Sequence, residues 1–280
     1  MKSTFKKLIA ATAVSLAFAA PASAAIGTGD GATLFLEAFD TVSQTSYTRD
    51  LGVSMNNFGT QNRPTGGFTT ILDDQVTDSF VSATDANFAA FLAASTPANV
   101  IWDVIAVDNN GSTAADQKRV VFTSLSNVTG ILAGAGVQWS NNGLNTSTAV
   151  ESTHVFGANA LLAGNPSAFT TNPVDPGNYQ TGKFNNLGGG LGAALVSTAA
   201  GLGQSMGFYY ATRSGTLGGN EVLSAAYKLG TGEAFQWTLD GAGNLSYGVA
   251  VAAPVPEPGT MALFVAGALM LGGMARRRMS

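Results

Sequence analysis

His154 is the only histidine in the chain, and histidine is the side chain best suited to act as a general base near neutral pH. A site that pairs a nucleophilic serine with a histidine would have to use it, within the stretch Glu151-Ser-Thr-His-Val155. We expect no serine of the kind that α/β-hydrolases present on a sharp turn to accompany it. We therefore interpret His154 as a surface or helix-packed histidine and predict no catalytic residue.

Carboxylates could support two other kinds of chemistry. Glycoside hydrolases use two carboxylates at a defined separation, and Asp103 with Glu233 is one pair whose separation the sequence does not give. The stretch Asp108–Asp116 offers oxygen ligands, but the twelfth position, a glutamate in EF-hand calcium loops, is Arg119. A second acidic cluster contains Asp73, Asp74 and Asp78. We expect solvated loop carboxylates at these places and predict no metal site.

Sites for larger ligands are weakly indicated. Gly188–Gly192 lacks the Lys-Ser/Thr pair of a phosphate-binding loop and the spacing of a dinucleotide fingerprint, so we predict no cofactor. Several aromatic residues could stack on sugar rings, although in a β protein most of them belong to the core: Trp102, Trp139, Trp237, Tyr209, Tyr210 and Tyr247. A carbohydrate-binding module is therefore kept as an alternative function.

The elements that position these residues are mostly strands. β-branched and aromatic residues predict strands over 33–39, 46–53, 99–107, 119–123, 205–212, 222–229, 233–239 and 244–249. Asp240–Gly243 is typical of a hairpin turn, and alternation in the preceding strand places Phe235, Trp237 and Leu239 on one face.

Two helices are predicted between the strands. Thr84–Ala94 has Asp85 as a capping residue, with Phe88, Phe91 and Leu92 on one face. Asn142–Leu162 is ambiguous, with a helix favoured by its apolar spacing. Residues 165–202 are poor in charge and rich in proline and glycine, which predicts a long surface loop.

These patterns predict a mainly β fold with a few helices, most simply one β-sandwich-like domain over residues 25–253. The chain has no cysteine, so disulfides and thiolate zinc sites are excluded and the core alone must hold the fold.

The amino terminus has the pattern of a secretory signal peptide over residues 1–24. A positive region, an apolar run over 8–20 and the cleavage pattern Ala22-Ser23-Ala24 follow one another, which predicts cleavage between Ala24 and Ala25. The positive region contains Lys2, Lys6 and Lys7. We therefore expect the chain to be exported across the inner membrane.

The carboxyl terminus, residues 254–280, has three parts. Pro256, Glu257 and Pro258 form a stiff, extended strip. An apolar helix is predicted over 260–275, with Thr260 as its cap. It is shorter than the roughly 20 residues of a comfortable bilayer span, so snorkelling arginines would help it to cross. The basic residues Arg276, Arg277 and Arg278 follow and favour a cytoplasmic end.

The two ends conceal the charge of the body. Six of the 13 basic residues lie in them, so residues 25–258 carry seven basic and 17 acidic residues, a formal net charge of −10. Phosphate binding needs clustered Lys and Arg, and we therefore exclude nucleic acid as a partner.

The tail resembles the PEP-CTERM sorting signal. Pro256-Glu257-Pro258 is the motif, and the apolar segment and basic cluster follow it at the right distance. The resemblance covers residues 255–278 and implies recognition at the inner membrane by an exosortase, a transpeptidase-like protease. It also implies removal of the tail and delivery to the surface of a Gram-negative, exopolysaccharide-producing bacterium.

We therefore predict a non-enzymatic protein of the cell surface or extracellular matrix, with exopolysaccharide as a candidate partner. The alternatives are the carbohydrate-binding module and, less favoured, a secreted hydrolase. The resemblance is confined to the tail and assigns no activity to residues 25–253.

Overall fold

A computed structural model describes residues 25–29, 32–58, 68–72, 79–81, 85–110, 118–125, 141–178, 199–213, 222–228 and 234–249. The chain divides into two compact units, Met1–Val249 and Ala250–Ser280. The predicted signal peptide over 1–24 and the sorting signal over 254–280 lie outside the described residues. None of the helices within the described ranges is long and apolar enough to cross a membrane.

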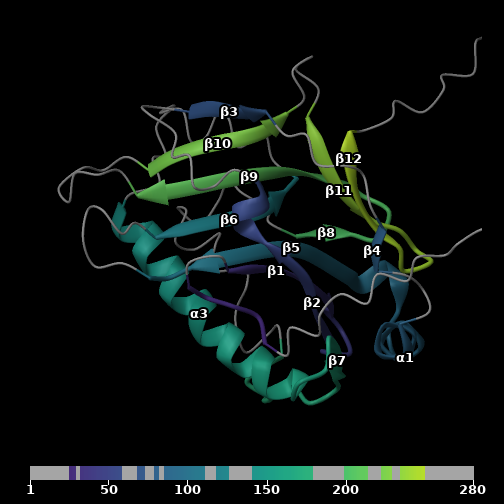
Figure 1. The fold of residues 1–280 in the computed structure, drawn as a ribbon. Coiled ribbons are helices and arrows are strands. Elements are labelled where there is room, and N and C mark those ends of the chain that lie inside the picture. Colours follow the sequence, from purple (N-terminus) through teal and green to yellow (C-terminus); the bar gives the residue numbers. More distant parts are fainter. Residues whose placement is uncertain are drawn as a thin grey trace, which may run out of the picture. The chain divides into compact units, whose positions relative to one another are not determined.

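The first unit is built on one large sheet, which confirms the predicted mainly β fold (Figure 1). The main path of hydrogen-bonded neighbours runs β4-β12-β11-β9-β6-β5-β1-β2-β7. Its strands are β1 (Thr33–Asp40), β2 (Ser46–Ser54), β4 (Ser79–Val81), β5 (Val100–Asp108), β6 (Arg119–Ser124), β7 (Ser167–Thr170), β9 (Ser205–Arg213), β11 (Phe235–Leu239) and β12 (Leu245–Val249). Off this path lie β3 (Phe68–Leu72), β8 (Ala200–Gly201) and β10 (Val222–Lys228).

The sheet branches at β9. One edge of β9 pairs with β6 along the strand, while its other edge pairs first with β11 at Ser205–Gly207 and then with β10 from Tyr209 onward. The strands therefore form one continuous, curled half-barrel, where a sandwich of two separate sheets was expected. Alternation along each strand is compatible with both arrangements, because it predicts an inner face but not which strands share hydrogen bonds.

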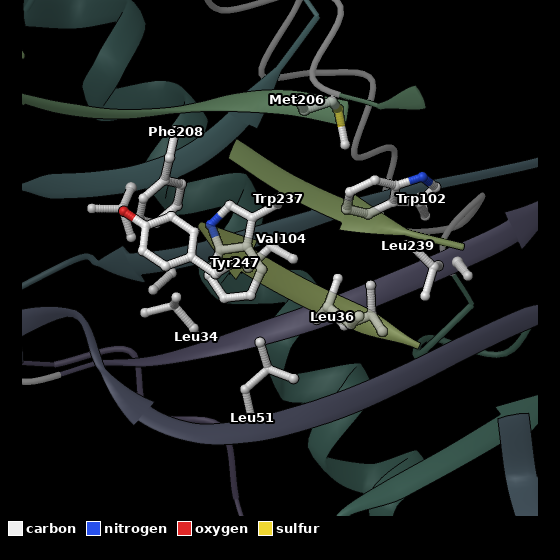
Figure 2. Close-up of a cluster of buried hydrophobic side chains, with 14 of the residues drawn as sticks. Leu34, Leu36, Leu51, Trp102, Val104, Met206, Phe208, Trp237, Leu239 and Tyr247 are labelled. Carbon is white, nitrogen blue, oxygen red and sulfur yellow. The ribbon is translucent and has the colours of Figure 1, made fainter. Parts of the chain in front are cut away.

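The inner face of the curled sheet holds the larger core. Its residues come from β1, β2 and β5 and also from β9, β11 and β12, which shows that distant strands face one another. Figure 2 shows Trp237 and Tyr247 meeting Phe208 on one side, with Leu36 and Val104 nearby. The rings of Trp237 and Tyr247 lie 4.7 Å apart, and those of Phe208 and Trp237 meet edge to face at 5.7 Å.

The outer face of the sheet is covered by the long helix α3 (Asn141–Leu162), whose formation confirms the favoured interpretation of that segment (Figure 1). A second core lies between them, with Phe35, Phe39 and Ile105 from the sheet and Val155 and Leu162 from the helix. The two cores give the unit a layered cross-section of α3, sheet and inner core.

A loop after β7 is fixed to α3 by a close backbone approach. A Cβ atom on Gly157 would lie 2.2 Å from the carbonyl oxygen of Pro176, and one on Gly177 would lie 2.8 Å from the carbonyl oxygen of Gly157. Two glycines are therefore required for this contact, since any side chain would push the loop off the helix.

The short helix α1 (Ala86–Ala94) forms as predicted. Asp85 is its N-cap, with its carboxylate accepting from the backbone N–H groups of Asn87 and Phe88. Phe88 and Phe91 are buried in the inner core. Two 3₁₀ turns, η1 (Met55–Phe58) and η2 (Pro97–Asn99), complete the described helical elements.

The predicted loop over 165–202 was wrong at both of its ends. Ser167–Thr170 is the strand β7, paired with β2, and Ala200–Gly201 is the strand β8, paired with β5. Strands of four and two residues are too short to show a periodic pattern. They form because a neighbouring strand supplies backbone N–H and C=O groups for hydrogen bonding. The local sequence gives no sign of that neighbour.

Candidate functional site

A cluster of ionisable side chains lies buried between the sheet and α3. His154 Nε2 is 2.5 Å from Glu37 Oε1, and both side chains are fully shielded from solvent. Glu151 and Asp103 are buried beside them at 0% exposure. His154 is therefore helix-packed, the second of the two interpretations given above.

The local sequence explains why these residues meet. In β1, the period-two alternation places Glu37 on the same face as Phe35 and Phe39, toward α3. The strand register sets Thr48 of β2 and Asp103 of β5 on either side of Glu37. On α3, Glu151 and His154 are three positions apart and share one face.

The electrostatics of this cluster favour the protonated forms of two groups, Glu151 and His154. Burial raises the pKa of Glu151 well above its ordinary value, and the charge of Glu37 raises it further. Burial lowers the pKa of His154, but the charge and hydrogen bond of Glu37 raise it by more, so the net change is upward. Both shifts therefore favour binding of a proton, one at His154 and one at Glu151.

The cluster is poorly supplied with hydrogen bonds. Thr48 Oγ1 donates to Glu37 Oε1 at 3.2 Å. Both carboxylate oxygens of Glu151, and Oε2 of Glu37, are buried and meet no hydrogen-bond partner in the described part of the chain. Ionising a buried group without hydrogen-bond partners is unfavourable in free energy, so these carboxyl groups tend to bind protons. The burial of the cluster also prevents contact with an external substrate.

A second polar cluster joins α1 to the sheet at Asp85. Its carboxylate accepts a hydrogen bond from the Tyr47 hydroxyl at 2.9 Å and from the Ser167 hydroxyl at 3.1 Å, and it forms an ion pair with Arg49. Burial alone would raise the pKa of Asp85, but the hydrogen bonds from Phe88 N and Tyr47 and the charge of Arg49 lower it overall. One carboxylate thus connects α1, β2 and β7.

Replacing Asp85 with alanine should lower the free energy of unfolding by about 2–4 kcal/mol, because a helix cap is lost and buried donors lose their acceptor. Chemical denaturation followed by circular dichroism measures this. Asp85→Asn, which keeps the cap acceptor, should cost less. Because the folded pKa of Asp85 is lowered, the advantage of the wild-type chain over Asp85→Asn should disappear as the pH falls below the ordinary value of 3.8. Equal losses for both variants would contradict this account.

Of the acidic residues considered for calcium binding, Asp108 is buried against Arg119, and the others named lie outside the described residues. Asp108 is buried at 4% exposure, contrary to the expected solvated carboxylate. Its Oδ2 accepts from Arg119 Nε at 3.0 Å and Nη2 at 2.6 Å, and Oδ1 accepts from Asn110 N at 3.0 Å. Residues 73–78, which hold the other acidic cluster, are not described. Over the described ranges, no group of three or more His, Asp or Glu side chains is arranged to hold a metal ion.

The residues considered for hydrolysis and sugar binding are not assembled into an exposed site. Asp103 is buried in β5, and Glu233 is outside the described residues. Four of the six aromatic candidates are core residues with at most 1% exposure: Trp102, Trp237, Tyr210 and Tyr247. Tyr209 is partly buried, and Trp139 is not described.

Ser205 was overlooked in the sequence analysis. Gly203-Gln-Ser-Met-Gly207 does match the G-x-S-x-G pattern, so the expectation of no such serine was wrong as a statement about sequence. The structure places Ser205 at the start of strand β9, where its Oγ is 2.6 Å from Thr238 Oγ1. A nucleophile elbow requires a strand-to-helix turn, so Ser205 does not form one.

Sequence reasoning also missed Glu37. The signal that could have identified it is an acidic residue between Phe35 and Phe39 on the apolar face of a strand. Its partner His154 is 117 positions away, and no local pattern connects the two.

The comparisons with known proteins concern the tail. Residues 254–278 match the family described as the PEP-CTERM protein-sorting motif. The chain therefore carries a C-terminal sorting signal, as an exosortase substrate does, which confirms the resemblance. Pro256–Pro258 and Arg276–Arg278 fall within the matched range, and their individual roles stay predictions. Neither the curated proteins nor the solved structures include a significant match.

Proposed function

We propose that this protein is a non-enzymatic component of the cell surface or extracellular matrix, delivered by its PEP-CTERM signal and associated with exopolysaccharide. The observation that carries the proposal is the sorting motif at residues 254–278. It supports export and membrane-associated sorting, with an exosortase as the processing partner. The predicted signal peptide at residues 1–24 agrees with this route.

The chemistry of the body supports a structural role over the alternatives. A hydrolase built on His154 would need an accessible imidazole, and this residue is 2% exposed on the sheet-facing side of α3. A sugar-binding face would need exposed aromatic rings, and Trp102 and Trp237 are both fully buried. The body's acidic character, with a net charge of −10 over 25–258, suits a hydrated matrix better than an anionic surface.

Deleting residues 254–280 should abolish sorting. Without the motif and its apolar segment, the protein should leave the inner-membrane fraction and should no longer reach the cell surface in its processed form. Cell fractionation with an epitope placed after residue 25, together with intact-mass measurement, tests this. An unchanged distribution between the inner membrane, the surface and the medium would refute the sorting claim.

A finer variant separates the motif from the membrane segment. Pro256→Ala combined with Glu257→Ala and Pro258→Ala keeps the apolar run, so the full-length protein should accumulate uncut in the inner membrane. In the wild type, digestion of the exopolysaccharide should release surface-bound protein into the medium. Retention after complete digestion would argue against polysaccharide as the partner while leaving the sorting result intact.

A further inference from the structure

Among the side chains that the structure describes, the interface between α3 and the sheet contains more acidic groups than bases. Glu151 and His154 face the sheet from α3, and Glu37 of β1 contacts the imidazole at 2.5 Å. Asp103 of β5 lies beside Glu37 in register. If Glu37 and Glu151 were both ionised, their two negative charges would lie beside the one positive charge of His154.

The other elements packed against α3 add no compensating base among the described side chains. In β2, Asp50 lies opposite Phe35, and its Oδ1 accepts from Gly52 N at 2.9 Å. Over residues 205–212 of β9, where the side chains are described, the titratable group on this face is the phenol of Tyr209, which packs against the second core. Strand β7 contributes no titratable residue. The charge balance therefore depends on protons.

Glu151 is the group that must take a proton. Its two carboxylate oxygens are buried and meet no hydrogen-bond donor among the described residues, while His154 is already engaged with Glu37. A buried carboxylate without donors or a cation is strongly disfavoured in its ionised form. The acid group can be accommodated as long as it is neutral.

We propose that α3 stays docked on the sheet only while Glu151 holds a proton, so that the helix is a pH-sensitive element released as the medium becomes alkaline. Releasing α3 would expose Glu151 to water, where it can ionise freely, and would uncover the apolar surface around Phe35 and Ile105. The proposal concerns the body alone and does not depend on where the protein is sorted.

The sign of the pH effect follows from the raised pKa of Glu151. Because burial holds this pKa above its ordinary value of 4.5, the docked state binds a proton that the released state gives up. Docking is therefore strongest below pH 4.5 and weakens as the pH rises toward the folded pKa. The raised pKa of His154 acts in the same direction, from its ordinary value of 6.5 upward.

The absence of cysteine makes a direct test simple. Ala158 is fully buried on the docked face of α3, and Ala160 is exposed on the same helix, so Ala158→Cys and Ala160→Cys form a matched pair. The ratio of their labelling rates with a thiol reagent cancels the pH dependence of the thiolate. In the full chain this ratio should rise with pH by up to about tenfold per unit for each linked proton.

Glu151→Gln supplies the decisive comparison, because glutamine resembles the protonated acid and cannot ionise. In the Glu151→Gln background the labelling ratio should rise less steeply with pH. The difference corresponds to one linked proton, up to about tenfold per pH unit. Asp240→Asn removes an acid in the turn between β11 and β12, away from α3, and should leave the slope unchanged. An equal slope with and without Glu151→Gln, or a flat ratio in the wild type, would overturn the proposal.

A second measurement detects the proton itself. At neutral pH, the infrared spectrum of the wild-type protein should contain the carbonyl band of a protonated carboxylic acid that is missing from Glu151→Gln. This readout does not require α3 to move and does not respond to a purely structural role. If the two spectra agree in this region at neutral pH, Glu151 is ionised in the folded protein and the inference is wrong.

Discussion

Replacing His154 with leucine should lower the free energy of unfolding by about 3–5 kcal/mol at neutral pH, because the carboxylate of Glu37 would lose its buried cation. Leucine is close in volume to the imidazole and packs well in a layer with Val155 and Leu162, so lost packing explains little of the effect. Denaturant unfolding followed by circular dichroism is the measurement.

The double variant Glu37→Leu with His154→Leu distinguishes charge from shape. Removing both partners leaves no unpaired ion at this contact, so much of the lost stability should return. The cost of His154→Leu should also shrink as the pH rises above 6.5, since the raised pKa of His154 means that the wild type loses its own ion pair there. A double variant as unstable as the single one would show that imidazole packing, not its charge, matters at this position.

The sequence is informative wherever a structural reason is local. Asp85 caps α1 through backbone groups two and three residues away, and such a cap can be recognised from residue type and spacing. The predicted alternation of Phe235, Trp237 and Leu239 was likewise confirmed, since all three are buried. Apolar residues at every second position are enough to predict the buried face of a strand.

Long-range pairing explains what the sequence did not reveal. Ser167 donates to Asp85 across 82 positions, which anchors β7, yet nothing in the charge-poor segment around Ser167 indicates a strand. The branching of β9 between β10 and β11 depends on register along a shared edge, so a half-barrel and a sandwich were equally consistent with the same alternation. The buried acids were hidden for the same reason, since burial is a property of the partner surface.

The two units of the chain thus differ in how their roles can be inferred. The tail acts through a short contiguous motif that a processing enzyme can bind, so residues 254–278 reveal their role directly. In the body, Glu37, Glu151 and His154 meet only when α3 is docked on the sheet, so no contiguous stretch of sequence indicates the cluster. Sorting and proton linkage should therefore be separable, with tail variants leaving unfolding unchanged and Glu151→Gln leaving sorting unchanged.

Replacing Trp237 with alanine should lower the free energy of unfolding by about 3–5 kcal/mol, the range for deleting a large buried aromatic side chain. Trp237 is fully buried, and its ring contacts those of Phe208 and Tyr247 from the neighbouring strands β9 and β12. These three strands close the inner face of the curled sheet over β1 and β5 (Figure 2). A cavity here would therefore weaken the contact between the two halves of the half-barrel.

Two controls make this expectation specific. Trp237→Phe keeps most of the ring contacts and should cost less than half as much as alanine. Gln236→Ala changes the adjacent residue, whose side chain lies on the opposite, partly exposed face of β11, and should stay within about 0.5 kcal/mol of the wild type. Circular dichroism is the appropriate probe, because removing a tryptophan alters fluorescence directly. If Trp237→Ala costs no more than Gln236→Ala, the inner face of β11 is not part of the core, and the curled arrangement of β9, β11 and β12 is wrong.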